Sequence, residues 1–145
     1  PFVILRPYII YGPRQNKDRL IPQTIISCLK NKSFDCSEGI QSRDFIFISD
    51  FNDLIKRIID KKIKGEIFNV GTGKPKNVKK VIKLIKNKIK KGKPVFGKIP
   101  LRKDEILTLY PKITKAKKLL GWKPKISFNR GIEKTIKYYK QNEIR

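Results

Sequence analysis

Hydrophobic residues along this chain form short continuous runs, separated by longer stretches in which they recur at helical spacing. The run Phe2 to Leu5 is typical of a strand buried on both faces of a parallel sheet, and Ile67 to Val70 is predicted as a further strand. Pro7 has no amide hydrogen to donate, so the first strand should end or bulge there. Further extended pieces are predicted over 33–36 and 45–48, with a short edge strand over 94–97.

Between these runs, apolar residues return every three or four positions, as in amphipathic helices. The pattern predicts helices over 21–30, after Asp50, from residue 78, over 114–121 and after Ser127. Asp50, with Asp53 three residues later, is expected to cap the second of these helices in a variant of the capping box. Because strands alternate with helices and no repeat or linker divides the chain, we predict one undivided α/β unit with some parallel sheet.

The 145 residues carry a net charge of +24, which on its own would suggest a nucleic-acid or anionic-membrane partner. Lys outnumbers Arg 28 to 8, and in the helix that begins at Val78 the lysines fill the face opposite the apolar residues. That helix has no aromatic residue on which a base could stack. The simpler interpretation is a solvated helix face, and a basic nucleic-acid-binding protein is kept as a distant alternative.

Composition also bears on the compartment. The chain begins with Pro1 and contains no Met, so we expect a fragment or a processed chain. No apolar run is long enough for a membrane span, and the first residues lack the layout of a signal peptide. Cys28 and Cys36 occur without His and without a CxxC motif, which argues against a zinc site. We therefore expect reduced thiols in a cytoplasmic protein.

Seven short motifs occur in the order and spacing of one enzyme family. They are L-R-P leading to Y-G-P-R within 5–14, R-L-I-P at 19–22, Q-S-R-D-F-I-F-I at 41–48, F-N-V-G-T-G at 68–73, R-K-D-E at 102–105, L-G-W-K-P-K at 120–125, and the stretch 131–136. Together they cover almost the whole chain. The sequence resembles the C-terminal half of extended short-chain dehydrogenases, the NAD-dependent nucleotide-sugar epimerases, dehydratases and reductases.

The resemblance implies the C-terminal part of a Rossmann-type parallel sheet joined to a small mixed α/β substrate-binding domain. Residues 1–15 and 66–91 would belong to the sheet, and 16–65 and 92–145 mainly to the substrate-binding lobe. The parent enzyme would use NAD or NADP, bound mainly by an N-terminal Rossmann part outside this chain, and would be a homodimer. Gly71-Thr72-Gly73 is a lone G-x-G, which we interpret as a backbone turn and not as the cofactor turn.

The acid/base pair of this family is a Tyr followed four positions later by a Lys, and it is missing here. Tyr110 is followed at that distance by Thr114, and Tyr138 by Asn142. We therefore assign no catalytic residue and expect this chain alone to be inactive. The parent enzyme would oxidise the sugar at C4 and then epimerise or dehydrate it. A 4-keto-deoxysugar reductase serving surface polysaccharide, or a non-catalytic truncated binding module, are the alternatives.

By resemblance, several residues would hold a nucleotide-diphosphate sugar. Arg43 and Arg102 match the arginines that grip the diphosphate, and a guanidinium fork suits phosphate oxygens. Glu105 matches an acid that accepts hydrogen bonds from the ribose hydroxyls, and Asn69 matches an amide that contacts the phosphate. Asp44, next to Arg43, is expected to have a structural role, as is Asp50.

Four further positions follow from the same resemblance. Arg19 and Leu20 match the start of the helix that passes under the nucleotide. Cys36 matches a position that packs along the base, where other members often have an aromatic residue. Tyr8 lies in the loop that faces the nicotinamide and the sugar. Ile9 departs from the family, because many members carry an Asn there that bonds the substrate phosphate, and this departure puts the substrate subtype in doubt.

Overall fold

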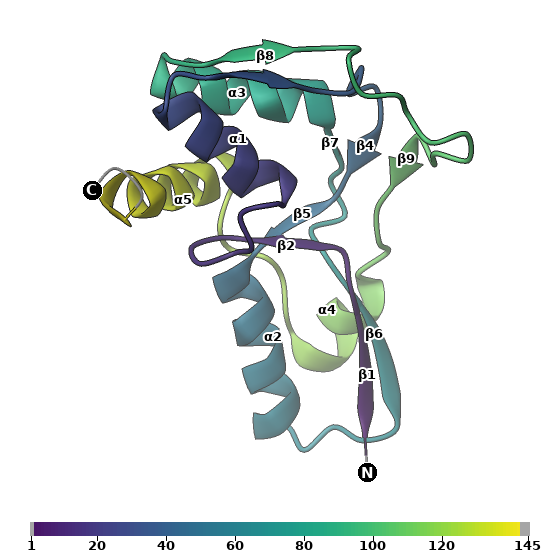
Figure 1. Ribbon diagram of the computed structural model, residues 1–145. Coiled ribbons are helices and arrows are strands. Elements are labelled where there is room, and N and C mark those ends of the chain that lie inside the picture. The colour runs from purple at the N-terminus through teal and green to yellow at the C-terminus, as the bar shows by residue number, and fades with distance from the viewer. Residues whose placement is uncertain (1, 143–145) are drawn as a thin grey trace.

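The computed structural model describes residues 2–142. Its strands are β1 (Val3–Pro7), β2 (Ile9–Tyr11), β3 (Ser33–Asp35), β4 (Ser42–Arg43), β5 (Phe45–Phe47), β6 (Glu66–Val70), β7 (Lys76–Asn77), β8 (Lys93–Val95) and β9 (Thr108–Leu109). Its helices are α1 (Leu20–Leu29), α2 (Ile48–Asp60), α3 (Val78–Ile89), α4 (Thr114–Leu120) and α5 (Phe128–Asn142) (Figure 1). The predicted α/β class is confirmed, and four of the five strand pairings are parallel.

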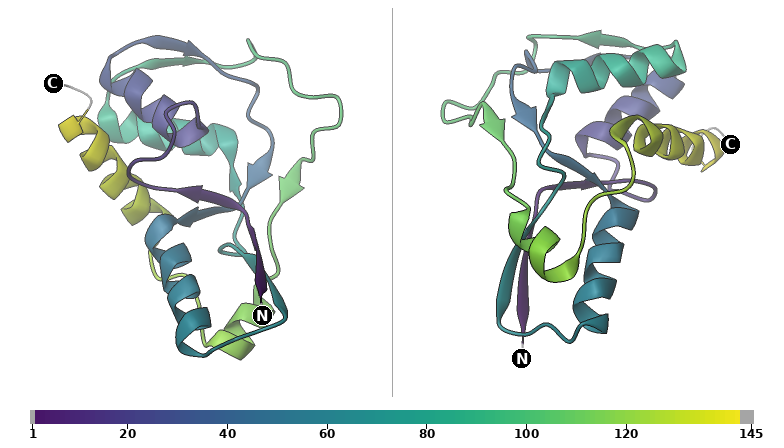
Figure 2. Two further views of the ribbon diagram at one scale, coloured as in Figure 1. Left: turned by 60° about the horizontal axis from the view of Figure 1, so that its bottom comes forward. Right: turned by 180° about the vertical axis from the view of Figure 1, so that it is seen from behind.

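One end of the molecule is built on the parallel pair β1–β6, in which Val3 lies opposite Glu66 and Pro7 opposite Val70. Helices α2 and α4 lie beside this pair (Figure 2). Their shared core is the buried cluster Ile46, Leu54, Ile58, Phe68, Val70, Ile113, Ala116, Leu120 and Trp122. The Trp122 indole N–H donates to the Asp50 carbonyl over 3.0 Å, so the single Trp ties α2 to the segment after α4.

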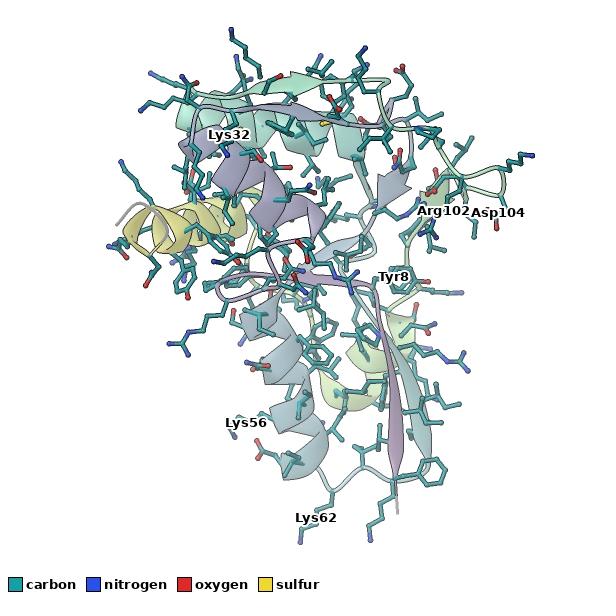
Figure 3. The ribbon with its side chains drawn as sticks, in the orientation of Figure 1. Tyr8, Lys32, Lys56, Lys62, Arg102 and Asp104 are labelled. Atoms are coloured by element: carbon teal, nitrogen blue, oxygen red, sulfur yellow. The ribbon has the colours of Figure 1, made fainter. Side chains whose placement is uncertain are left out.

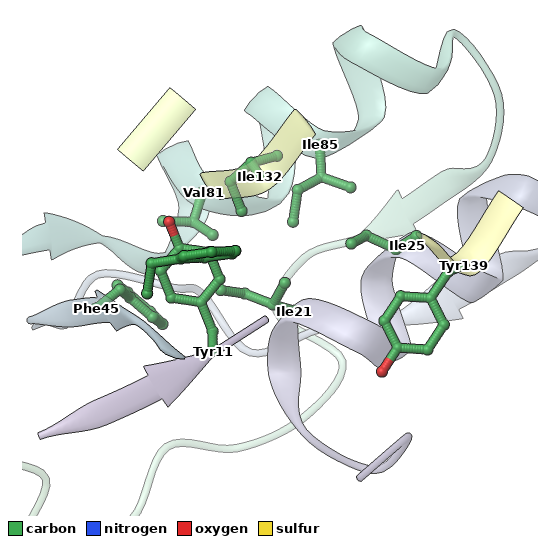
Figure 4. Close-up of a cluster of buried hydrophobic side chains, with 9 residues drawn as sticks. Tyr11, Ile21, Ile25, Phe45, Val81, Ile85, Ile132 and Tyr139 are labelled. Atoms are coloured by element: carbon green, nitrogen blue, oxygen red, sulfur yellow. The ribbon is translucent and has the colours of Figure 1, made fainter. Parts of the chain in front are cut away.

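The other end packs α1, α3 and α5 against one another and against the parallel pair β2–β5, with β3 and β8 paired along the outside (Figure 1). Figure 4 shows its core, and the buried members are Tyr11, Ile21, Ile25, Phe45, Phe47, Val81, Ile85, Ile132 and Tyr139. Tyr11 stacks edge-on against Phe47 at 5.5 Å between ring centroids. Burial raises the pKa of Tyr11, and its hydroxyl donates to the Phe128 carbonyl.

Two helices join the two cores along the chain. Helix α2 contributes Leu54 and Ile58 to the core around β6. Helix α3 contributes Val81 and Ile85 to the core with α1 and α5. The division of the chain into a sheet part (1–15 and 66–91) and a substrate-binding lobe (16–65 and 92–145) stays a prediction.

The expected cap of α2 is wrong. Helix α2 begins at Ile48, directly after β5, and its cap position is Phe47, which makes no side-chain cap bond. Asp50 lies inside the first turn and is only 3% exposed. Its carboxylate accepts the backbone amides of Lys125 and Ile126 over 3.1 and 3.0 Å, so it anchors the segment before α5 and leaves its own helix uncapped. The expected structural role of Asp50 is confirmed, through a different partner.

Strand β1 is less buried than its apolar run predicted. Val3 and Leu5 pack against the core, whereas Ile4 and its partner Ile67 point outward and are 43% and 39% exposed. Within the described residues, β1 pairs only with β6. One face and the outer edges of this two-stranded sheet are therefore open.

Candidate functional site

A cleft of about 310 Å³ opens between α1, β3, β4 and the first turns of α3. The walls of the cleft are mainly apolar and include a few polar groups. The lining residues are Ile9, Leu20, Gln23, Thr24, Phe34, Asp35, Cys36, Ser37, Gln41, Arg43, Phe45, Val78, Ile82 and Ile99. Three residues chosen from the sequence meet here, namely Leu20, Cys36 and Arg43. An apolar cleft with a few converging polar groups is the usual form of a small-molecule site.

Arg43 is the cation of the cleft, and its side chain is only 16% exposed. One terminal nitrogen, Nη1, donates to the Ser42 carbonyl over 2.8 Å. The other, Nη2, forms an ion pair with the carboxylate of Glu105, whose side chain is 19% exposed. Partial burial strengthens attraction between opposite charges. The two residues are 62 positions apart in sequence, and Glu105 lies beside the cation of the cleft without itself lining the cleft.

Arg102 lies on the loop between β8 and β9 that also carries Glu105, and the Glu105 amide donates to its carbonyl over 3.2 Å. Figure 3 shows Arg102 and Asp104 on this loop. Arg102 is exposed and is not among the lining residues of the cleft. It lies three residues before Glu105, the acid that pairs with Arg43.

The remaining predicted residues lie outside the cleft. Arg19 is exposed and occupies the cap position of α1, directly before Leu20. Asn69 is exposed on β6, opposite Arg6 of β1, and does not line the cleft. Tyr8 is half-buried at the carboxyl end of β1, and its amide donates to the Val70 carbonyl over 2.9 Å (Figure 3).

Asp44 fixes the backbone next to Arg43. It is fully buried, and its carboxylate accepts three hydrogen bonds, from the Thr72 amide (2.7 Å), the Thr72 hydroxyl (2.9 Å) and the Lys74 amide (3.0 Å). These bonds hold the turn after β6 against the strand that carries Arg43. The structural role predicted for Asp44 is confirmed.

The same bonds decide what the G-x-G turn can do. Gly73 has a φ of +71°, the left-handed conformation that glycine adopts readily. The amides of Thr72 and Lys74 already donate to Asp44, so they are not offered to a ligand. A pyrophosphate site needs such amides free, and this turn does not fit that role, in agreement with its interpretation as a backbone turn.

The base-packing position, Cys36, is 7% exposed and lies in a small buried cluster with Val78 and Ile82. Burial, aided by the carboxylate of Asp35, raises the pKa of the Cys36 thiol, so the side chain is a neutral, weakly polar wall.

Gln41 is a cleft residue that the sequence interpretation missed. It lies two positions before Arg43, and its Oε1 is buried without a hydrogen-bond partner among the described residues. Gln41 lies directly before β4 and outside any strand, so no periodic pattern marked it in the sequence.

Two further properties concern the molecule as a whole. Across residues 2–142, no helix combines the length and the apolar character that a membrane span requires. The same part of the chain contains no cluster of three or more acidic or Cys side chains suited to a metal ion.

On the opposite side of β4 from Arg43, a hollow of about 710 Å³ is lined in part by Ser42, Lys76 and Lys80.

Comparison with known proteins gives consistent matches. The family model described as GDP-mannose 4,6 dehydratase matches residues 1–135. The dTDP-D-glucose 4,6-dehydratase of Mus musculus is 32% identical over 150 residues, which cover 98% of this chain and 42% of that protein. CDP-abequose synthase of Salmonella muenchen is 30% identical over 138 residues, covering 93% of this chain and 47% of that protein.

Solved structures agree with these relatives. The UDP-glucose 4-epimerase of Thermotoga maritima, solved with UDP-glucose, matches with a TM-score of 0.87 at 27% identity, over 97% of this chain and 46% of that one. The dTDP-glucose 4,6-dehydratase of Bacillus anthracis, solved with NAD, matches with a TM-score of 0.84 at 25% identity, over 97% and 45%. The chain thus spans less than half the length of these relatives.

Proposed function

Because this chain belongs to the family of NAD-dependent nucleotide-sugar dehydratases and epimerases that the GDP-mannose 4,6-dehydratase model describes, we propose that it holds the nucleotide diphosphate of a sugar nucleotide. The observation that carries the proposal is Arg43, a largely buried cation at the side of an apolar cleft. A nucleoside diphosphate combines a planar, weakly polar base with a strongly anionic group, and the cleft offers a complementary surface to each.

Each of these residues would contact a different part of the ligand. Leu20, Cys36 and the adjoining apolar side chains would enclose the base, and Arg43 would bind the diphosphate through its guanidinium fork. Glu105, already within reach of Arg43, would turn to the ribose hydroxyls when the phosphate oxygens take its place. Arg102, on the same loop, would add a second cation when that loop closes over the ligand. Arg19 and Asn69 would make at most outer contacts, since neither lines the cleft.

The parent enzyme would use NAD or NADP, which accepts a hydride from the sugar at C4 when bound. Within this chain, Tyr8 lies at the carboxyl end of β1, the edge at which open parallel sheets bind their ligands. The G-x-G turn has its amides occupied by Asp44, so the proposal assigns it no cofactor contact.

The catalytic acid/base would come from outside this chain, because none of its five Tyr residues is followed by Lys at the fourth position. We therefore propose a nucleotide-sugar-binding part that does not turn over substrate alone. The proposal includes a homodimeric full-length enzyme in the cytoplasm, with an N-terminal Rossmann part as the partner of this one. Incubation of the chain with UDP-, dTDP-, CDP- and GDP-sugars and NAD should yield no product, and measurable turnover would contradict this account.

Binding is tested by calorimetric titration of the chain with UDP, dTDP, CDP and GDP. At least one should bind, and Arg43→Leu should weaken that complex by about tenfold or more, since hydrogen bonds to charged groups contribute about 1.5–3 kcal/mol. Arg130→Leu is the matched control, because Arg130 is an exposed residue on α5 that lies outside the cleft. Equal affinities for the two variants would refute the role of Arg43.

A further inference from the structure

A second hollow, of about 470 Å³, lies between the turn after β6, helix α4 and the start of α5. It shares only Phe45 with the lining of the Arg43 cleft. Five of the twelve residues that line it are lysines, and none of the twelve is acidic. Lysine makes up 28 of the 145 residues of the chain, so its share of this lining is about twice its share of the sequence. The lysines of this lysine hollow are Lys74, Lys76, Lys117, Lys123 and Lys125.

Most of these cations have no anionic partner within residues 2–142. Lys125 lies 3.8 Å from a carboxylate oxygen of Asp53. The other four lysines are exposed and form no ion pair with the described residues. The carboxylate of Asp44 is fully buried and is occupied by the turn after β6. Like charges brought together in this way repel one another, so an anion that enters the hollow would relieve the repulsion.

The backbone that carries the lysines is fixed by buried groups. The Asp44 carboxylate accepts the Lys74 amide over 3.0 Å. Lys123 follows Trp122, whose indole N–H donates to the Asp50 carbonyl, and precedes the segment whose amides donate to the Asp50 carboxylate. A ligand would therefore have to order only the lysine side chains, which lowers the entropic cost of binding.

The shape of the lysine hollow favours a compact ligand. Its walls also include Phe45, Ile113, Ile126 and Phe128, so the ammonium groups surround a partly apolar concave surface. The neighbouring hollow of about 710 Å³ shares Lys76 and Phe128 with it. An ammonium group is a point charge with three donors, which suits phosphate oxygens without requiring a fixed orientation.

We propose that the lysine hollow binds a compact oligophosphate, at a site separate from the nucleotide-sugar cleft. Lys74, Lys76, Lys117 and Lys123 would each donate to phosphate oxygens. A single exposed ion pair stabilises little, so several phosphates are needed to engage several lysines at once. The site should therefore prefer inorganic tripolyphosphate to orthophosphate.

The test titrates tripolyphosphate calorimetrically into the unmodified chain and into two double variants at about 0.15 M salt. Lys117→Gln/Lys123→Gln should weaken the complex about fivefold or more, because two of the four ammonium groups are lost. Lys134→Gln/Lys137→Gln is the matched control, since it removes the same charge from exposed positions of α5 outside the hollow. The control should bind tripolyphosphate within about twofold of the unmodified chain, and orthophosphate should bind at least about tenfold more weakly than tripolyphosphate.

Equal losses in the two double variants would overturn the proposal, because affinity would then follow net charge alone. Absence of tripolyphosphate binding to the unmodified chain would overturn it as well. Arg43→Leu separates the two sites and should leave tripolyphosphate binding unchanged. If Arg43→Leu abolishes that binding while Lys117→Gln/Lys123→Gln does not, the anion binds in the Arg43 cleft and the lysine hollow is refuted.

A second measurement needs no variant. Acetylation of the unmodified chain by acetic anhydride, followed by mass spectrometry, reports the reactivity of each lysine with and without tripolyphosphate. Lys117 and Lys123 should be protected by the anion, whereas Lys134 and Lys137 should react equally in both conditions. Uniform protection of all four would overturn the site. The nucleoside-diphosphate titrations test the Arg43 cleft independently, so either site can fail without the other.

Discussion

Replacing Asp44 by Asn removes one acceptor from a fully buried group that accepts three hydrogen bonds. The amide keeps one oxygen for the Thr72 backbone N–H, but its NH₂ group would face the Lys74 N–H, so two donors would meet. Each hydrogen bond to a charged partner contributes about 1.5–3 kcal/mol, and neutral bonds contribute less. The loss of one bond and the weakening of the others predict a destabilisation of about 2–4 kcal/mol.

Urea unfolding followed by Trp122 fluorescence measures this change, since Trp122 is the only Trp and is fully buried. Asp60→Asn is the control, because Asp60 is about half exposed and its ion pair with Lys56 stabilises the helix by only about 0.3–0.5 kcal/mol. Asp44→Asn should also weaken nucleotide binding, because the turn it holds supports the strand of Arg43. A loss of less than about 1 kcal/mol, comparable to that of the control, would refute the reasoning.

Three further changes test separate features. Gly131→Ala should lower the urea midpoint, because the added Cβ would overlap the Tyr11 hydroxyl and overpacking costs about 1–3 kcal/mol; an unchanged midpoint would contradict the close packing. Burial raises the pKa of Cys28 from 9.0 to about 11, so the unfolded thiol ionises first and the free energy of unfolding should fall as the pH rises from 9.0 to about 11. Cys28→Ala should flatten this decline in pH-dependent urea titrations, and identical slopes would count against it. Duplex DNA should bind this basic chain only at low salt, so a nanomolar complex at about 0.15 M salt would favour the nucleic-acid alternative.

Local patterns predicted most of the helices and strands, because apolar periodicity depends only on neighbouring residues. The lysine-rich helix was expected from residue 78 and begins at Val78. The prediction failed where a side chain forms hydrogen bonds to residues far away in the sequence. Asp50 looked like a helix cap, but its carboxylate bonds the amides of Lys125 and Ile126, and no local signal announces a partner 75 residues away.

The candidate site was only partly accessible from sequence. Motif resemblance selected Arg43, Leu20 and Cys36, which do line one cleft. Gln41 was missed because a single Gln has no periodicity that marks it. For Asn69, strand alternation was informative but unused, since Phe68 and Val70 are both buried and the residue between them must face away from that core.

The separation of Arg43 and Glu105 by 62 residues has a consequence for how the chain folds. Their ion pair closes a long loop, and the chain loses the conformational entropy of that loop before the ion pair contributes to stability. Long-range contacts of this kind slow folding, and they form only when most of the intervening chain is in place. A nucleotide that needs both residues would therefore not bind to an early collapsed species of the chain. The bound nucleotide should slow unfolding and leave the rate of refolding almost unchanged, and stopped-flow measurements with and without ligand can detect this difference.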